Sequence, residues 1–324
     1  MPAESNIDVH QLYQLAMRIR AVELVIAERY SEQEMRCPVH LSVGQELVPA
    51  AFGLMFDADI DACFSAHRSH AHYLGVGGDL SAMFGELLGK GFGCAGGKGG
   101  SMHLIDPSAG LKGAVPIVGS SIPMAVGYAH ARKIQNNKGI TIVFLGDGAT
   151  EEGVFSESLD YASLNGLRVI FVIEANRYSV YTGLERRQST ARDILDISNA
   201  HGVEAIGADG YDAAAVIDLV SSAMNSTRKN CRPMTLQFDT YRWLEHCGPH
   251  DDDNLGYRPA GELQSWIDRC PLKQLASNLS GPEYDSLLAT LKSDINAEFE
   301  RCRASPHSLT AEDLFSNLYG DLQL

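Results

Sequence analysis

Two short apolar runs, each leading to a polar side chain, constrain this chain more than any other feature. Residues 141–145 (TIVFL) and 169–173 (VIFVI) are rich in β-branched and aromatic residues. Such runs predict strands that are buried on both faces, as in a parallel sheet. The first run continues into 146–148 (Gly-Asp-Gly), and Asn176 follows after a further 27 residues. Because parallel strands end at one edge of a sheet, we expect Asp147 and Asn176 to lie close together.

These two side chains offer the ligands that Mg²⁺ prefers. The ion takes oxygen ligands and usually binds a protein through one or two side chains together with a ligand's phosphates. Gly146 and Gly148 would let the backbone turn and approach a phosphate closely. A helix predicted over residues 149–165 would point its first amides at an anion. The sequence therefore predicts a metal and diphosphate clamp, with an ordinary strand-to-helix turn as the alternative for Gly-Asp-Gly alone.

Helical and strand patterns alternate through the centre of the chain. Apolar spacing predicts helices over 9–31, 122–135, 153–164 and 212–226, and strands over 140–145, 168–173 and 234–238. This alternation predicts an α/β fold with a doubly wound, mostly parallel sheet and helices on both faces. Ligands would then bind beyond the carboxyl ends of the strands.

The end of the chain predicts a charged amphipathic helix over residues 282–304, which would pack on the domain or form a subunit interface. Its apolar face comprises Leu287, Leu288, Leu291, Ile295 and Phe299. No repeat or flexible linker is visible. We therefore expect residues 1–324 to form a single domain with an N-terminal helix and a C-terminal helical extension.

Composition excludes several classes of protein. The net charge of −15 argues against a nucleic-acid surface, which needs clustered Lys and Arg. The seven cysteines are scattered without a CxxC pair, so neither a zinc site nor a disulfide framework is predicted. No secretion signal and no run of 18 apolar residues is found, so we expect no membrane association and a cytoplasmic protein with reduced thiols.

Further motifs point to one enzyme family. Asn176-Arg-Tyr178 lies at the distance from Gly-Asp-Gly that is typical of thiamine-diphosphate enzymes. Together with segments 40–46, 66–70, 96–103, 117–119 and 240–243, the chain resembles the alpha subunit of the pyruvate, branched-chain 2-oxo acid and acetoin dehydrogenases. The likeness covers roughly residues 10–300. It implies the thiamine-diphosphate-binding fold, with thiamine diphosphate and Mg²⁺ as cofactors.

The resemblance assigns roles at the diphosphate end. Asp147 and Asn176 would bind the metal with their side chains, and Tyr178 with its backbone carbonyl. The diphosphate and the rest of the cofactor would contact a larger set of residues: His67, Arg68, Val118, Gly146, Asp147, Gly148, Ala149, Asn176, Val180 and Arg242. Among these, the arginines suit phosphate because guanidinium stays charged and binds bidentately. The two valines would contact the aminopyrimidine end or support the bent cofactor.

Three histidines are candidates for catalysis. Decarboxylation followed by acyl transfer needs groups that exchange protons near neutrality, which histidine supplies. By resemblance, His246 would lie near the reactive carbon, with His40 and His70 as further active-site histidines. Arg68, His70 and His72 occupy every second position and alternate with small or apolar residues, so they would share one face of a strand or cap a loop. Residues 251–253 (three aspartates) predict a solvated loop rather than a metal cluster.

The resemblance also implies partners. The glutamate that activates the cofactor comes from a beta subunit in two-chain members of the family, and we find no counterpart here. We therefore expect a two-alpha, two-beta heterotetramer that acts on a small 2-oxo acid, with a lipoyl acyltransferase as a possible partner. The sequence after His246 departs from the family, since Cys247 stands where serine is usual.

Three other functions remain open at this point. The altered loop allows a carboligase that passes the acyl group to another carbonyl compound. A non-catalytic partner subunit is an alternative from another class. The GxGxxG match at 91–96 suggests a nicotinamide enzyme, but it follows a predicted helix over 80–88 rather than the strand that the fingerprint requires.

Overall fold

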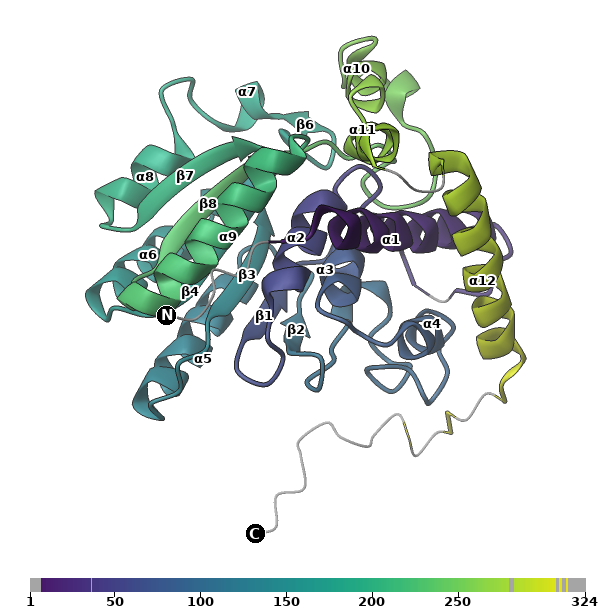
Figure 1. Cartoon of the computed structure of the whole chain (residues 1–324), viewed down its shortest axis with the longest axis horizontal. Coiled ribbons are helices and arrows are strands. Elements are labelled where there is room, and N and C mark those ends of the chain that lie inside the picture. Colours follow the sequence, from purple (N-terminus) through teal and green to yellow (C-terminus); the bar gives the residue numbers. More distant parts are fainter. Residues whose placement is uncertain (1–6, 36, 280–282, 307–308, 311–312, 314–324) are drawn as a thin grey trace.

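A six-stranded parallel sheet forms the centre of the molecule (Figure 1). The computed structural model describes residues 7–35, 37–279, 283–306, 309–310 and 313. All neighbouring strands pair in parallel. Their order is β2 (Leu111–Ala114), β1 (Ala62–Ser65), β3 (Thr141–Gly146), β4 (Val169–Ala175), β8 (Met234–Asp239) and β7 (Glu204–Asp209). The predicted fold class is confirmed, and the three predicted strands are present with ends that differ by at most two residues.

Helices cover both faces of this sheet, because side chains along β3 alternate between two cores. Ile142 and Phe144 belong to one core, and Val143 and Leu145 to the other. The first core is shared with α1 (Val9–Tyr30), α2 (Leu47–Met55) and α9 (Ala213–Asn230); the second is shared with α5 (Ser121–Ile134), α6 (Gly153–Leu164) and α8 (Ile194–Ala200). Figure 1 shows these two sets of helices on opposite sides of the sheet. This is the doubly wound arrangement that the sequence predicts.

The remaining elements surround this centre. They are α3 (His70–Gly75), α4 (Leu80–Leu87), α7 (Leu184–Arg187), α10 (Glu262–Asp268), α11 (Pro271–Asn278), α12 (Tyr284–Ala304), the 3-10 turns η1 (Ser101–His103), η2 (Asp147–Glu151) and η3 (Asp253–Leu255), and a hairpin of β5 (Tyr178–Ser179) and β6 (Thr182–Gly183). The amphipathic helix near the end of the chain is confirmed as α12. Its Ile295 and Phe299 are buried, and it contacts α1 and α4. Packing on the domain accounts for its apolar face.

The helix after Asp147 begins at Gly153, as the apolar spacing predicts, and not at Ala149, as the anion-binding interpretation of this segment assumed. The sequence suggested one helix over residues 149–165, but the chain first forms η2 and starts α6 only at Gly153. The Thr150 hydroxyl donates to the Asp147 carbonyl at 2.7 Å, and Glu152 has an extended backbone, which separates the two elements. A short 3-10 turn, rather than an α-helix N-terminus, therefore presents its amides at the end of β3.

The glycine-rich segment after α4 wraps around a carboxylate of the protein itself. Buried Glu86 accepts hydrogen bonds of 2.6–2.9 Å from the backbone amides of Ala95, Gly97, Gly99 and Gly100. Glycines let the backbone converge on this one side chain. Because the segment follows a helix, the dinucleotide-binding interpretation of residues 91–96 has no structural support.

Two further findings concern the chain as a whole. Each of the seven cysteines is a free thiol. Within the part of the chain that the structure describes, no helix is both long enough and apolar enough to span a bilayer.

Candidate active site

A cavity lies at the carboxyl ends of β1, β3 and β4, where a doubly wound fold places its ligands. Residues after β1, β3 and β4 contribute to its wall, together with the loop that carries His246. Most of the predicted site residues line it: His67, Arg68, Val118, Gly146, Asp147, Gly148, Ala149, Asn176, Tyr178 and His246. The structure therefore brings together segments that are far apart in the sequence.

The predicted metal ligands face this cavity from neighbouring strand ends. Asp147 is 3% exposed, and its carboxylate accepts a hydrogen bond from the Arg187 guanidinium. Burial raises the pKa of Asp147 above its ordinary value, and the Arg187 guanidinium offsets only part of this rise. The Asn176 side-chain oxygen accepts from the Tyr178 amide at 2.9 Å and keeps a second lone pair. This carboxylate and this amide form a donor set that suits Mg²⁺.

Two wall residues that the sequence analysis missed also fit a polar ligand. The side-chain oxygens Gln45 Oε1 and Glu174 Oε1 are buried without a hydrogen-bond partner, and both residues line the cavity. The second carboxylate oxygen of Glu174 bonds to His72 at 3.0 Å. Buried polar atoms are normally satisfied, so these atoms point to a bound molecule with polar groups. Glu174 could have been noticed as a charged residue at the end of an apolar run.

Three histidine rings cluster beside the cavity, two pairs of them in T-shaped contact and the third pair tilted. The ring centroid of His40 lies 4.9 Å from that of His67 and 5.1 Å from that of His246. Burial, reinforced by the Arg68 charge, lowers the pKa of His40 to about 2, of His67 to about 4 and of His246 to about 3. All three are therefore neutral at pH 7.

Their ligand nitrogens lie within 4.8 Å of one another, which is close enough for a metal ion. The guanidinium of Arg68 disfavours a divalent cation at that position. Neutral imidazoles in a cavity are better suited to donate or accept hydrogen bonds at a substrate.

His70 lies elsewhere. It begins α3, where it bonds to Glu23 at 3.0 Å and to Ser101 at 2.7 Å, and it does not line the cavity. The idea that Arg68, His70 and His72 share a strand face is wrong, because the chain turns into a helix at Ser69. These contacts favour a structural role for His70, and its catalytic role stays a prediction.

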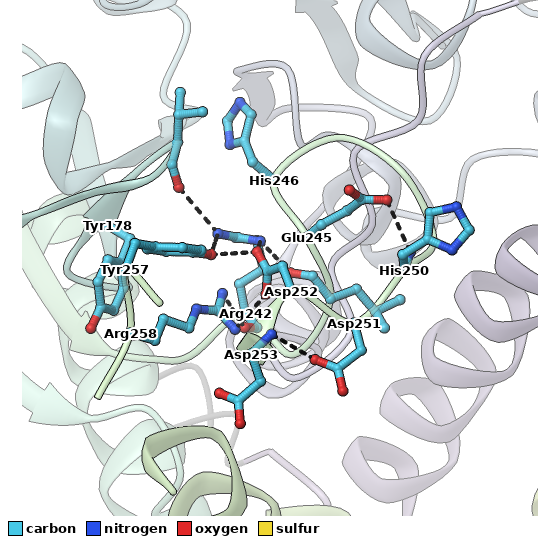
Figure 2. Close-up of polar contacts among 12 residues, drawn as sticks. Tyr178, Arg242, Glu245, His246, His250, Asp251, Asp252, Asp253, Tyr257 and Arg258 are labelled. Atoms are coloured by element: carbon cyan, nitrogen blue, oxygen red, sulfur yellow. Dashed lines mark hydrogen bonds and ion pairs between the residues drawn. The ribbon is translucent and has the colours of Figure 1, made fainter. Parts of the chain in front are cut away.

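Arg242 lies behind the cavity wall in a cluster of buried charges (Figure 2). It contacts the Asp252 carboxylate at 3.3 Å and the Tyr257 hydroxyl at 3.0 Å, and it donates to the carbonyls of Leu244 and Val180. These bonds tie Arg242 to the backbone of Val180. Neither residue lines the cavity, so their direct contact with a cofactor stays a prediction.

The prediction of a solvated loop at residues 251–253 is wrong for Asp252. Its side chain is 1% exposed and lies between Arg242 and Arg258, at 3.3 and 3.0 Å. Two buried guanidinium groups require a counter-charge, which the aspartate provides. Asp251, in contrast, is exposed.

Arg68 fixes the histidine loop to the rest of the site. Its guanidinium donates to the carbonyls of Leu41 at 2.5 Å and His246 at 3.1 Å. Burial, together with the nearby charge of Arg242, lowers the pKa of Arg68 to about 9, so it remains charged at neutral pH. Arg68 thus contributes positive charge to the cavity and positions the backbone of His246.

Comparison with known proteins identifies the family of this chain. The family described as dehydrogenase E1 component matches residues 14–308. The chain belongs to this family. The pyruvate dehydrogenase E1 component subunit alpha of Rickettsia bellii is 30% identical over 93% of this chain and 92% of its own length. The alpha subunit of acetoin:2,6-dichlorophenolindophenol oxidoreductase is 35% identical in Bacillus subtilis, over 72% of this chain and 70% of the relative, and 33% identical in Cupriavidus necator, over 87% and 85%.

Membership confirms the resemblance to alpha subunits of thiamine-diphosphate-dependent 2-oxo acid dehydrogenases. Enzymes of this family use thiamine diphosphate with a divalent metal, commonly Mg²⁺. The residues in the cavity fit these groups, because acidic and amide oxygens, a cationic arginine and unpaired polar atoms lie in one wall. An alpha subunit also implies a beta subunit as its partner.

Proposed function

We propose that this chain is the alpha subunit of a two-chain enzyme that decarboxylates a pyruvate-like 2-oxo acid, or cleaves acetoin, and passes on the acyl group. The observation that carries the proposal is that Asp147 and Asn176, at the ends of adjacent strands, face the same cavity as Arg68 and His246. When bound, thiamine diphosphate supplies the carbon nucleophile and the electron sink for such chemistry. The protein's part is to bind it, orient it and move protons.

Each residue has a proposed part in this work. Asp147, Asn176 and the Tyr178 carbonyl hold the metal. Ala149 offers its backbone amide to the diphosphate, and Gly146 and Gly148 let the backbone approach it. The cationic Arg68 and the neighbouring His67 contact the cofactor from the same cavity. Arg242 acts near the diphosphate through its contact with the backbone of Val180. Val118, which lines the cavity, contacts the aminopyrimidine end.

The histidines would act near the reacting atoms. His246 and His40 are neutral at pH 7 and lie together, so they can donate or accept hydrogen bonds at the substrate oxygen. His70 is included only through the family resemblance.

We propose that a beta subunit supplies the activating glutamate in a two-alpha, two-beta heterotetramer. Exposed apolar side chains beside the cavity support a partner at this edge: Ile117 is 70% exposed and Val118 is 48% exposed. Such side chains are typical of surfaces that another chain covers. A lipoyl acyltransferase would then receive the acyl group. A cytoplasmic location is a further proposal, which the seven free thiols support.

Calorimetric titration of the heterotetramer with thiamine diphosphate and Mg²⁺ tests the function. We expect Asp147→Ala to weaken cofactor binding at least about 100-fold, because loss of a metal ligand removes a charged contact in a buried site. Asp209→Ala is the control, since Asp209 also ends a strand but pairs with Arg269 at the surface. Equal affinity of both variants would contradict the assigned metal site. Absence of binding by the wild type would support the non-catalytic alternative.

A second candidate function rests on the loop after His246. Cys247 and Gly248 begin a segment that would face the acceptor, and its departure from the family favours a carbonyl compound in place of the lipoyl group. Product formation from a 2-oxo acid and an aldehyde acceptor, measured with and without a lipoyl domain, separates the two. Transfer only to the lipoyl domain would exclude the carboligase.

A further inference from the structure

Arg187 lies over the turn that carries Asp147. It ends α7, and its side chain is only 8% exposed. The guanidinium forms ion pairs with Asp147 and Glu151, and its Nε donates to the Thr182 carbonyl at 3.2 Å. A methyl group on Gly148 would lie 3.5 Å from Arg187 Nη1. The guanidinium thus lies directly beside both the carboxylate and the backbone of this turn.

Neighbouring residues hold the same segment in place. The side-chain amide of Gln188 donates to Glu151 at 2.7 Å, and Arg192 donates to the Thr150 carbonyl at 2.5 Å. Residues 182–192 therefore lie as a strap across the 147–151 turn. Arg187 is the member of this strap that reaches the carboxylate of Asp147.

The guanidinium of Arg187 and a metal ion would compete for the carboxylate of Asp147. A buried carboxylate needs a counter-charge, and Arg187 provides it here. Mg²⁺ must take an oxygen of the same carboxylate as a ligand. This brings the metal ion and the Arg187 guanidinium together in a buried site, where like charges repel strongly. The arrangement becomes favourable only when an anion lies between them, and a diphosphate in this cavity would be that anion.

We propose that Arg187 neutralises Asp147 in the cofactor-free protein and turns to the diphosphate when metal and cofactor bind. This inference rests on the proposed function and adds a cofactor-binding residue to it. Guanidinium suits both positions, because it stays charged and binds carboxylate and phosphate with the same fork of donors. The strap makes metal binding and diphosphate binding depend on each other.

Two binding measurements test the exchange without any activity assay. The first is titration of the full chain alone with Mn²⁺, followed by electron paramagnetic resonance. We expect Arg187→Gln to bind Mn²⁺ about 3- to 10-fold more tightly than the wild type, because the competing cation is gone. The second is calorimetry of the heterotetramer with thiamine diphosphate at saturating Mg²⁺, in which Arg187→Gln should bind about 10-fold more weakly because a charge-assisted contact is lost.

Arg186→Gln is the matched control, since it removes the same charge from the exposed neighbouring residue. If the wild type binds both ligands and the two variants behave alike, the exchange is wrong and the proposed function stands. If the wild type binds neither Mn²⁺ nor thiamine diphosphate, both proposals fall.

Arg187→Lys keeps the charge without the fork and should give smaller changes of the same sign. Thermal unfolding verifies that each variant is folded. Should Arg187→Gln fail to fold, Arg187→Lys decides, and wild-type affinities for both ligands in that variant would overturn the exchange.

Discussion

The turn after β3 and the loop that carries His246 line the same cavity, but different forces hold them in place. The turn, residues 146–148, continues a strand that pairs with β4 up to Gly146 and Glu174. The loop, residues 244–258, has no strand of its own, and its one short helical element is η3. It is held by Asp252 between two arginines, by Arg68 at the His246 carbonyl, and by a 2.9 Å bond from Gly248 to Val39.

This difference predicts different weaknesses. Backbone pairing with β4 fixes the turn at its strand end, and the ion pairs of Arg187 with Asp147 and Glu151 add to it, so a single substitution in the turn should leave its position largely unchanged. Buried ions fix the loop, so removal of one charge should leave the others without compensation.

The largest effect is expected for Asp252→Asn. The substitution keeps the shape but leaves Arg242 and Arg258 buried without their carboxylate (Figure 2). Breaking a buried ion pair costs about 3–5 kcal/mol. We expect a loss of this size in urea unfolding, or fast hydrogen exchange confined to residues 244–258. Asp251→Asn, on the exposed neighbour, should change stability by less than about 0.5 kcal/mol, and similar losses in both variants would contradict the contrast.

A smaller effect is expected for Gly148→Ala in the turn. Its Cβ would lie 3.3 Å from Ser179 Oγ and 3.4 Å from Ser179 Cβ, a tight but bearable approach. We expect less than about 1 kcal/mol of destabilisation but about 10-fold weaker thiamine diphosphate binding, since the methyl group stands where the backbone meets the phosphate. Gly153→Ala is the control because nothing lies within 4 Å of its added Cβ. Unchanged cofactor affinity in Gly148→Ala would place the diphosphate elsewhere.

The smallest effect concerns pH. The folded protein holds the pKa of His67 at about 4, below its ordinary value of 6.5. The unfolded chain therefore binds more protons between these values, so stability is lost as the pH falls from about 6.5 to about 4. His67→Gln should make the thermal unfolding midpoint less dependent on pH in this range, whereas exposed His10→Gln should not. An equal slope in His67→Gln and the wild type would argue against the buried, neutral histidine.

Local patterns predicted much of the fold and the first half of the site. The runs at 141–145 and 169–173 specified buried parallel strands, because continuous β-branched and aromatic residues suit a sheet that is covered on both faces. Once those strands are parallel neighbours, Asp147 and Asn176 must share an edge. Apolar spacing predicted α6 at Gly153–Leu164 correctly, but its extension back to residue 149 was wrong, because residues 147–151 form a 3-10 turn with a Thr150 side-chain bond that propensity does not register.

Tertiary contacts decided the rest. Nothing in the sequence near Asp252 distinguishes it from Asp251, and only the return of the chain past Arg242 and Arg258 buries one and exposes the other. The same holds for Arg187, which lies 40 residues from Asp147 and meets it only because β5, β6 and α7 fold back over η2. Periodicity determined the sheet and the edge where the ligand binds. Pairing of charges that are far apart in the sequence depends on the tertiary structure, because only the folded chain determines which charged groups are buried next to each other and must compensate one another.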